Sequence, residues 1–233
     1  MAGPHLTIGD FFSYVSRNRA MLWEYLFQHI MMVLLGVGLA IIIGVPLGIW
    51  CSRSKGAAKI IMAITNVLQV IPSLAMLVLL MMWLGLGMMT VTFGLFLYSL
   101  NPVVRNTYVG LTQVNSSYVE AGRGVGMSRM QMLLQVRLPL SLPYILSGIR
   151  IAAVIAVGVA AIAPLIGGSG LGREIYAGIN NQNPLRIYAG AIPAAVLAIA
   201  ADIVLGALQR KVNMERRKSR KSDAVPPVPK TQG

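Results

Sequence analysis

Long runs of uncharged, mostly apolar residues alternate along the chain with short clusters of charge. A helix needs about 20 mainly apolar residues to cross the roughly 30 Å hydrocarbon core of a bilayer. Residues 60–104 carry no charge and are long enough for two crossings, and the glycines of Leu84–Gly87 supply the break between them. The pattern therefore predicts a transmembrane domain at 29–209 with five spans, near residues 29–50, 59–83, 89–108, 145–166 and 187–209.

The composition agrees with a membrane protein rather than a soluble globule. Hydrophobic residues make up 56% of the chain and charged residues only 12%, against about 45–50% and about 25% in soluble proteins. The formal net charge of +13 is also typical of a nucleic-acid-binding protein, so the positions of the basic residues have to decide between the two.

The basic residues are divided unequally between the two sides of the predicted membrane domain. Sixteen of the twenty Lys and Arg residues lie on one side, together with the C-terminal tail, and four lie on the other. By the positive-inside rule, the richer side is cytoplasmic. We therefore expect a multi-pass protein of the cytoplasmic (inner) membrane, with its N-terminus outside, its C-terminus in the cytoplasm and no nucleic-acid partner.

The two ends of the chain differ from its apolar middle. Residues 1–28 carry balanced charges and six aromatic side chains, which favours a helix lying in the membrane interface. Residues 210–233 form a basic, proline-containing tail, which we expect to be disordered from Asn213 onward and to touch anionic lipid. Because Cys51 is the only cysteine and no His and Cys residues cluster, we expect no intramolecular disulfide, no metal site and no cofactor.

The segment between the third and fourth predicted spans is the one sizeable cytoplasmic loop. Apolar residues at helical spacing predict a short helix, a glycine-bearing turn at Gly122–Gly126 and a second helix. Ser128 is the expected N-cap of that second helix, and Pro139 and Pro143 are expected to end it. Such a loop suits docking of another protein, although a loop that packs only on its own membrane helices is the alternative.

Residues 112–141 of this loop contain a recognisable spacing. Glu120-Ala121-Gly122 is followed after three residues by Gly126 and, nine residues later, by Val136-Arg137-Leu138-Pro139. This resembles the EAA signature of ABC-type import permeases, which reads Glu-Ala-Ala, three residues, Gly, nine residues, Ile, one residue, Leu-Pro. The chain departs from it at Gly122 and Val136, both of which are small or isosteric changes. The resemblance assigns docking of an ATPase to Glu120, Ala121, Gly122, Gly126, Met127, Ser128, Val136, Leu138 and Pro139.

Three further segments resemble the small permeases of osmoprotectant importers, which carry glycine betaine, carnitine or choline. They are Gln69–Ala75, Asn101–Thr107 and Gly167–Gly172. The resemblance implies an all-α membrane protein with the five-span type I ABC importer permease fold, which the methionine importer permease shares. It also implies a coupling helix around Glu120, a second permease that is a copy or a paralogue, two ABC ATPase subunits and an extracytoplasmic solute-binding protein.

The chain lacks a Gly-x4-Gly-Lys-Ser/Thr phosphate loop, so ATP hydrolysis is expected in a separate subunit and the chain itself is not an enzyme. The hypothesis is therefore the permease of an ATP-driven osmoprotectant importer. The alternatives are a permease for methionine or another small solute, and an ion-coupled secondary transporter.

Polar side chains within the predicted spans are candidates for the translocation pathway, because such groups tend to face a bundle interior or a wet cavity. Asn66, Gln69 and Ser73 share one face of the second span. Tyr98 and Asn101 share a face of the third, together with Arg105, which we interpret as an anchor at the cytoplasmic end. The alternative is that these side chains hold neighbouring helices together.

Two titratable residues lie within or beside the predicted spans. Asp202 is the one acidic residue inside a span, and it is a candidate for proton coupling or for an ion pair with a nearby Lys or Arg, which is the interpretation we favour. His29 stands at the outer edge of the first span, where we expect it to be interfacial.

Overall fold

The computed structural model describes residues 7–222, and every regular element within that range is helical. The α-helices are α1 (Ile8–Arg17), α2 (Arg19–Arg53), α3 (Lys55–Val70), α4 (Ser73–Leu84), α5 (Met88–Thr112), α6 (Ser116–Gly124), α7 (Arg129–Gln131), α8 (Leu138–Ala160), α9 (Gly172–Asn180) and α10 (Pro184–Ser222). A π-helical turn, η1 (Met132–Arg137), precedes α8, and a 3-10 turn, η2 (Ala163–Ile166), follows it.

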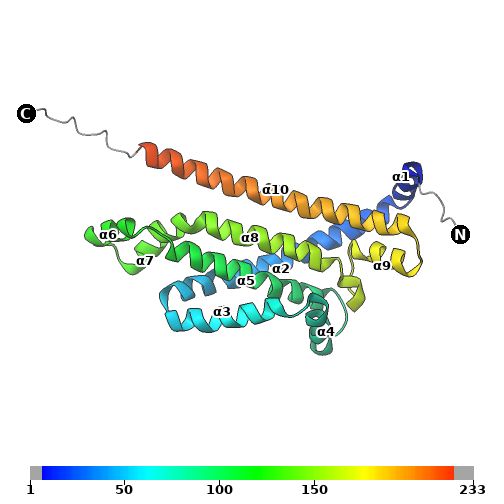
Figure 1. The fold of residues 1–233 in the computed structure, drawn as a ribbon, viewed down its shortest axis with the longest axis horizontal. Coiled ribbons are helices and arrows are strands. Elements are labelled where there is room, and N and C mark those ends of the chain that lie inside the picture. The colour runs from blue at the N-terminus through cyan, green and yellow to red at the C-terminus, as the bar shows by residue number, and fades with distance from the viewer. Residues whose placement is uncertain (1–6, 223–233) are drawn as a thin grey trace, which may run out of the picture.

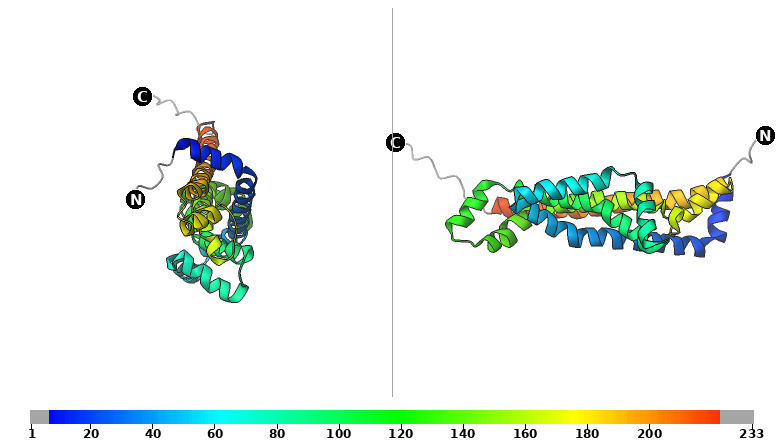
Figure 2. Two further views of the ribbon diagram at one scale, coloured as in Figure 1. Left: turned by 90° about the vertical axis from the view of Figure 1, so that its right-hand side faces the viewer. Right: turned by 90° about the horizontal axis from the view of Figure 1, so that it is seen from below.

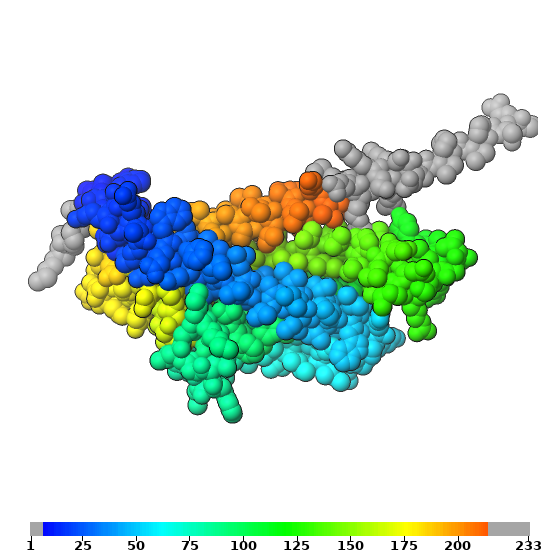
Figure 3. Space-filling model, turned by 180° about the vertical axis from the view of Figure 1, so that it is seen from behind, coloured from blue at the N-terminus to red at the C-terminus, as the bar shows by residue number. Residues whose placement is uncertain are grey.

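The long helices form an elongated bundle. In Figure 1, α10, α8, α5 and α3 follow one another across the bundle, and α2 runs behind α5 and α8. Seen from behind, α2 covers the middle of the molecule (Figure 3). Helices α1 and α9 lie at one end of the bundle, and α6 and α7 lie at the opposite end (Figure 2).

Glycines on one face of α2 allow its backbone to approach α5 closely. A Cβ atom at Gly36 would lie 2.6 Å from Cβ of Leu95, and one at Gly48 would lie 2.5 Å from Cβ of Thr107. Neither position has room for a larger side chain. Association through small residues is typical of helices within a membrane, where packing and not the exclusion of water drives contact.

The number of spans is only partly fixed by length and hydropathy. Among the described residues, three helical stretches are each long and apolar enough to cross a membrane, namely Arg19–Arg53, Arg129–Ala160 and Pro184–Asn213. Helix α5 has 25 residues but buries polar side chains such as Ser99 and Thr107 at the centre of the bundle. The count of five spans therefore stays a prediction.

The second predicted span, near 59–83, is not one continuous helix, and that its two halves together cross the membrane stays a prediction. Helix α3 ends at Val70, α4 begins at Ser73, and the two are bent by 102°. Pro72 lacks a backbone N–H and pushes the residue before it towards an extended conformation, and Ile71 has φ −61° and ψ 127°. Figures 1 and 3 show α4 projecting from the bundle.

The expected break at Leu84–Gly87 is confirmed. Helix α4 ends at Leu84 and α5 begins at Met88. Between them Gly85 has φ +77° and Gly87 has φ +130°, values that other residues rarely adopt.

The fourth span also differs from its expected limits of 145–166. Helix α8 runs from Leu138 to Ala160, so Pro139 and Pro143 lie in its early turns and do not end the preceding helix. Pro139 is the second residue of α8, a position that tolerates proline, whereas Pro143 lies inside the helix. The wider π turn η1 joins α7 to α8, so residues 129–160 form one continuous helical stretch.

Both terminal predictions need correction. Residues 1–28 do not form one interfacial helix, because α1 ends at Arg17 and residues from Arg19 onward already belong to α2. The tail is not disordered from Asn213, since α10 continues to Ser222. The rest of the predicted tail, 223–233, lies outside the described residues, as do residues 1–6.

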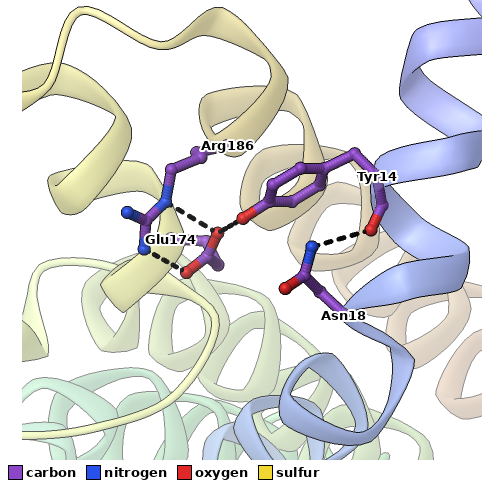
Figure 4. Close-up of polar contacts among 4 residues, drawn as sticks. All are labelled: Tyr14, Asn18, Glu174 and Arg186. Atoms are coloured by element: carbon purple, nitrogen blue, oxygen red, sulfur yellow. Dashed lines mark hydrogen bonds and ion pairs between the residues drawn. The ribbon is translucent and has the colours of Figure 1, made fainter.

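A buried ion pair fixes α1 to the rest of the molecule (Figure 4). The hydroxyl of Tyr14 donates to Oε2 of Glu174 at 2.6 Å. Arg186 donates from Nη2 to Oε1 of Glu174 at 2.7 Å and from Nε to Oε2 at 3.1 Å. Asn18 donates to the backbone carbonyl oxygen of Tyr14 at 2.9 Å. These contacts join α1, α9 and the start of α10.

The protonation states of this cluster are stable at neutral pH. Burial raises the pKa of Glu174, but the hydrogen bonds from Arg186 and Tyr14 outweigh it and hold that pKa below the ordinary value of 4.5. Burial and the bond to Glu174 raise the pKa of Tyr14 to about 12. Because the folded pKa of Glu174 is lowered, its stabilising contribution is present above pH 4.5 and is lost as the pH falls through the folded pKa.

We predict that Gly48→Ala lowers the thermal stability of the purified protein, because the new methyl group overlaps Thr107 and overpacking costs about 1–3 kcal/mol. Gly38→Ala on the same helix is the matched control, since nothing lies within 4 Å of a Cβ atom there. Thermal unfolding in detergent measures both variants. Equal melting temperatures for the two variants would contradict the close contact.

We predict that Glu174→Gln loosens α1 by about 2 kcal/mol, because the hydroxyl of Tyr14 in α1 loses its charged acceptor and Arg186 no longer holds a carboxylate in place beside it. Hydrogen exchange of the amides in residues 8–17 should then be faster. Glu24→Gln is the control, because that exposed carboxylate bonds only its neighbour Gln28. The wild type should lose the same protection only in acid, below the ordinary carboxyl pKa, and unchanged exchange in Glu174→Gln would refute the role.

Candidate functional site

The predicted docking loop forms a compact helical projection at the end of the bundle away from α1 and α9 (Figure 1). Asn115 is the N-cap of α6, and its Oδ1 accepts a hydrogen bond from the backbone N–H of Ser117 at 2.9 Å. Ser128 caps α7 as expected. Its Oγ accepts from the backbone N–H of Gln131 at 3.3 Å, and Oε1 of Gln131 accepts from the backbone N–H of Ser128 at 2.8 Å. The N-cap prediction is confirmed.

The turn between α6 and α7 depends on two glycines of the EAA-like spacing. Gly126 has φ +78°, which a residue with a side chain rarely adopts. Gly122 is buried, and a Cβ atom there would lie 2.5 Å from Cε of Met132. The N–H of Met127 donates to the carbonyl of Gly122 at 3.0 Å and closes the turn. Glycine in place of the second alanine of the signature thus accommodates Met132.

The outer surface of the loop combines one carboxylate with apolar side chains. Of the positions assigned to docking, Glu120, Ala121, Gly126, Ser128 and Pro139 are exposed, Met127, Val136 and Leu138 are half-buried, and Gly122 is buried. Val125 is 80% exposed and Met130 is 55% exposed. Exposed apolar groups beside polar ones are typical of protein interaction sites. Val125 is one of the apolar positions whose spacing predicts the helices of the loop, but only the fold shows that its side chain is exposed.

The loop connects α5 to α8, and these two helices make two close contacts with each other. A Cβ atom at Gly110 would lie 2.8 Å from Cβ of Tyr144, and one at Gly148 would lie 2.5 Å from the carbonyl oxygen of Pro102. Such packing leaves little freedom for the two helices to slide independently.

The structure brings three of the five pathway candidates into contacts between helices. Nδ2 of Asn101 donates to Oδ1 of Asn66 at 2.7 Å and joins α5 to α3. The hydroxyl of Tyr98 donates to the backbone carbonyl of Ile71, at the bend between α3 and α4. These contacts agree with the helix-to-helix alternative for Asn66, Tyr98 and Asn101. Gln69 and Ser73 are half-buried, and their place in a pathway stays a prediction.

Asp202 forms an ion pair with Arg150, 52 positions away in sequence. Nε of Arg150 donates to Oδ1 of Asp202, and Nη2 donates to Oδ2, both at 2.6 Å. The partner lies in α8 and not among the basic residues that follow the last span. A hollow lies beside the pair.

His29 lies inside the bundle, and its expected position at the membrane interface stays a prediction. Its side chain is fully buried, and Nε2 lies 3.1 Å from the carbonyl oxygen of Val157 in α8. The close approach of α2 and α8 encloses the ring.

Comparison with known sequences identifies relatives along most of the chain. Residues 44–214 match the family model described as binding-protein-dependent transport system inner membrane component. The glycine betaine/carnitine/choline transport system permease protein OpuCD of Bacillus subtilis is 44% identical over 207 residues, covering 88% of this chain and 90% of that protein. The osmoprotectant import permease protein OsmW of Salmonella typhimurium is 41% identical over 205 residues, covering 86% and 95%.

Two solved structures share the fold. Inward-facing MetNI, a methionine ABC transporter, matches with a TM-score of 0.76 at 20% identity, over 84% of this chain and 98% of the matched one. An amino acid ABC transporter matches with a TM-score of 0.70 at 21% identity, over 91% and 100%. The expected fold of the methionine importer permease is confirmed. Together with the family match over residues 44–214, these likenesses show that the chain belongs to the inner-membrane components of binding-protein-dependent transport systems.

Proposed function

We propose that the chain is the membrane-spanning permease subunit of an ABC importer that moves a small osmoprotectant into the cytoplasm. The solute is a quaternary amine such as glycine betaine, carnitine or choline. Two ATPase subunits supply the energy, and a second permease, either a copy or a paralogue, completes the membrane unit. An extracytoplasmic solute-binding protein delivers the solute, and the basic tail contacts membrane lipid.

The observation that carries this proposal is the exposed loop around Glu120, held rigidly at one end of the bundle. Its carboxylate makes no ion pair within the described part of the chain and is free for a partner. The apolar Val125 and Met130 beside it supply surface for burial. Because α5 and α8 leave the loop in close contact, motion of an ATPase seated there reaches the membrane helices.

The orientation in the membrane follows from the basic residues at the two ends. Arg123 and Arg129 lie in the α6–α7 loop, at the end where α10 carries Arg210 and Lys211. The opposite end has fewer basic residues. We therefore assign the loop to the cytoplasm and α1 to the outside.

The choice of solute rests on the names of the relatives. Those at 38–44% identity include permeases for glycine betaine, carnitine and choline. An ion-coupled secondary transporter is not favoured, because Asp202, the acidic residue that it would use, is neutralised by Arg150.

We predict that proteoliposomes containing the permease, its ATPase and its solute-binding protein accumulate glycine betaine only when ATP is inside the vesicles with the ATPase. Unlabelled carnitine and choline should compete with the labelled solute, and methionine should not. Uptake that proceeds with the permease alone would favour the ion-coupled alternative. If methionine competes and the quaternary amines do not, methionine becomes the proposed solute.

We predict that Gly126→Val reduces both co-purification of the ATPase and ATP-dependent uptake by about tenfold, because a β-branched residue at φ +78° distorts the turn by about 1–3 kcal/mol. Gly124→Ala is the matched control, as that glycine is in α6 with nothing within 4 Å of a Cβ atom. If both variants assemble and transport normally, the loop does not dock the ATPase.

A further inference from the structure

The ion pair between α8 and α10 borders an open hollow. The side chains of Arg150 and Asp202 stay 34% and 43% exposed, although each helix belongs to a stretch apolar enough to cross a membrane. The hollow measures about 350 Å³, and its lining is completed by Ser147, Ile151, Val154 and Ile155. Pockets of this size hold small organic ligands.

The hollow opens on the side of α8 that faces away from α2. Ala152 and Ala156 are fully buried in the core that α8 shares with α2. At 100° per residue, Ser147, Ile151 and Val154 lie roughly half a turn around the helix from those alanines. Helix α2 therefore leaves the hollow uncovered.

A half-exposed ion pair is unfavourable against lipid tails. Charged side chains within membrane spans face a bundle interior or a water-filled cavity, where their charge can be solvated. The pair in the hollow is therefore expected to meet water, a solute or a partner subunit and not acyl chains.

The pair retains hydrogen-bonding capacity of both kinds. A guanidinium carries five N–H donors, and a carboxylate offers about four acceptor positions. The contact between Arg150 and Asp202 uses two of each. Gly206 lets the guanidinium lie directly against α10, because a Cβ atom there would lie 3.1 Å from Nη1. One cation and one anion, beside three aliphatic side chains, match a small molecule that carries both charges.

We propose that this hollow binds zwitterionic solutes during their passage through the permease, an inference that rests on the proposed function. The solute carboxylate takes the place of Asp202 on Arg150, its cationic group lies against Asp202, and its methyl groups contact Ile151, Val154 and Ile155. When no solute is bound, the two side chains neutralise each other, so neither charge is left unpaired within the membrane.

The test measures equilibrium binding of labelled glycine betaine, with choline as competitor, to the purified permease–ATPase complex without the solute-binding protein. The wild type should bind glycine betaine saturably. Arg150→Gln should weaken the binding of glycine betaine by about tenfold or more and the binding of choline by less than about twofold, because choline has no carboxylate. The double variant Arg150→Gln/Asp202→Asn leaves no unpaired charge and should weaken both ligands by about tenfold or more.

Gln209→Leu is the matched control, since it removes another polar contact between α10 and α8, a bond from Nε2 to the carbonyl oxygen of Pro143 at 3.1 Å. The proposal is overturned if the wild type shows no saturable binding or if Arg150→Gln leaves the ratio of the two dissociation constants unchanged. Wild-type affinity in the double variant would also overturn it. So would a loss of affinity in Gln209→Leu as large as that in the Arg150 and Asp202 variants. ATP-driven uptake by the wild type with its binding protein, measured in parallel, separates the two failures: uptake without these effects rejects the hollow alone, and absence of uptake rejects the proposed function.

Discussion

The tight contact between α5 and α8 is the constraint on which the rest of the account depends. At Gly110 and Gly148 the two helices approach so closely that a Cβ atom would lie within 3 Å of its neighbour. The loop carrying Glu120 starts and ends at this contact, so it is an extension of the membrane bundle and not a flexible link. Under the proposed function, the motion of an ATPase seated on the loop passes to the membrane helices through this contact.

Close packing of the helices also explains where polar groups lie within the bundle. Helix α5 is enclosed by its neighbours, which allows Asn101 to bond Asn66 and allows buried hydroxyls in a membrane protein. The ion pair of Arg150 and Asp202 lies at the edge instead, on the side that α2 does not cover. A second ion pair, between Glu174 and Arg186, lies at the end of the bundle beside α1, whose Tyr14 also bonds Glu174. The two ion pairs thus lie at an end and an edge of the bundle, while small residues allow the close approach of the helices at its centre.

Local chemistry predicted the features that depend on neighbouring residues. The break at Leu84–Gly87 follows from glycine, and the cap at Ser128 follows from the capping spacing to Gln131. Pro72 makes a bend in the second span possible, but the angle of 102° could not be predicted, because an uninterrupted apolar run says nothing about direction. Pro139 was taken for a helix end, although a proline in a first turn is equally compatible with a helix start.

Contacts between residues that are far apart in the sequence could not be predicted from it. Tyr14 and Glu174 are 160 positions apart, and only the packing of α1 on α9 brings them together. For the same reason Asp202 was expected to pair near its own helix end, whereas Arg150 reaches it from α8. The hollow beside that pair has no linear signature, since it joins residues of two helices that are separated by η2 and α9.

The most direct test of the central claim places a second cysteine, Val125→Cys, at the exposed surface of the loop, while the native Cys51 is buried. A bifunctional thiol-to-amine reagent is then applied to membranes that contain the assembled complex. The account predicts a cross-link to the ATPase whose yield changes when ATP binds. A cysteine that reacts only with reagents confined to the outer face, or one that never reaches the ATPase, would contradict it.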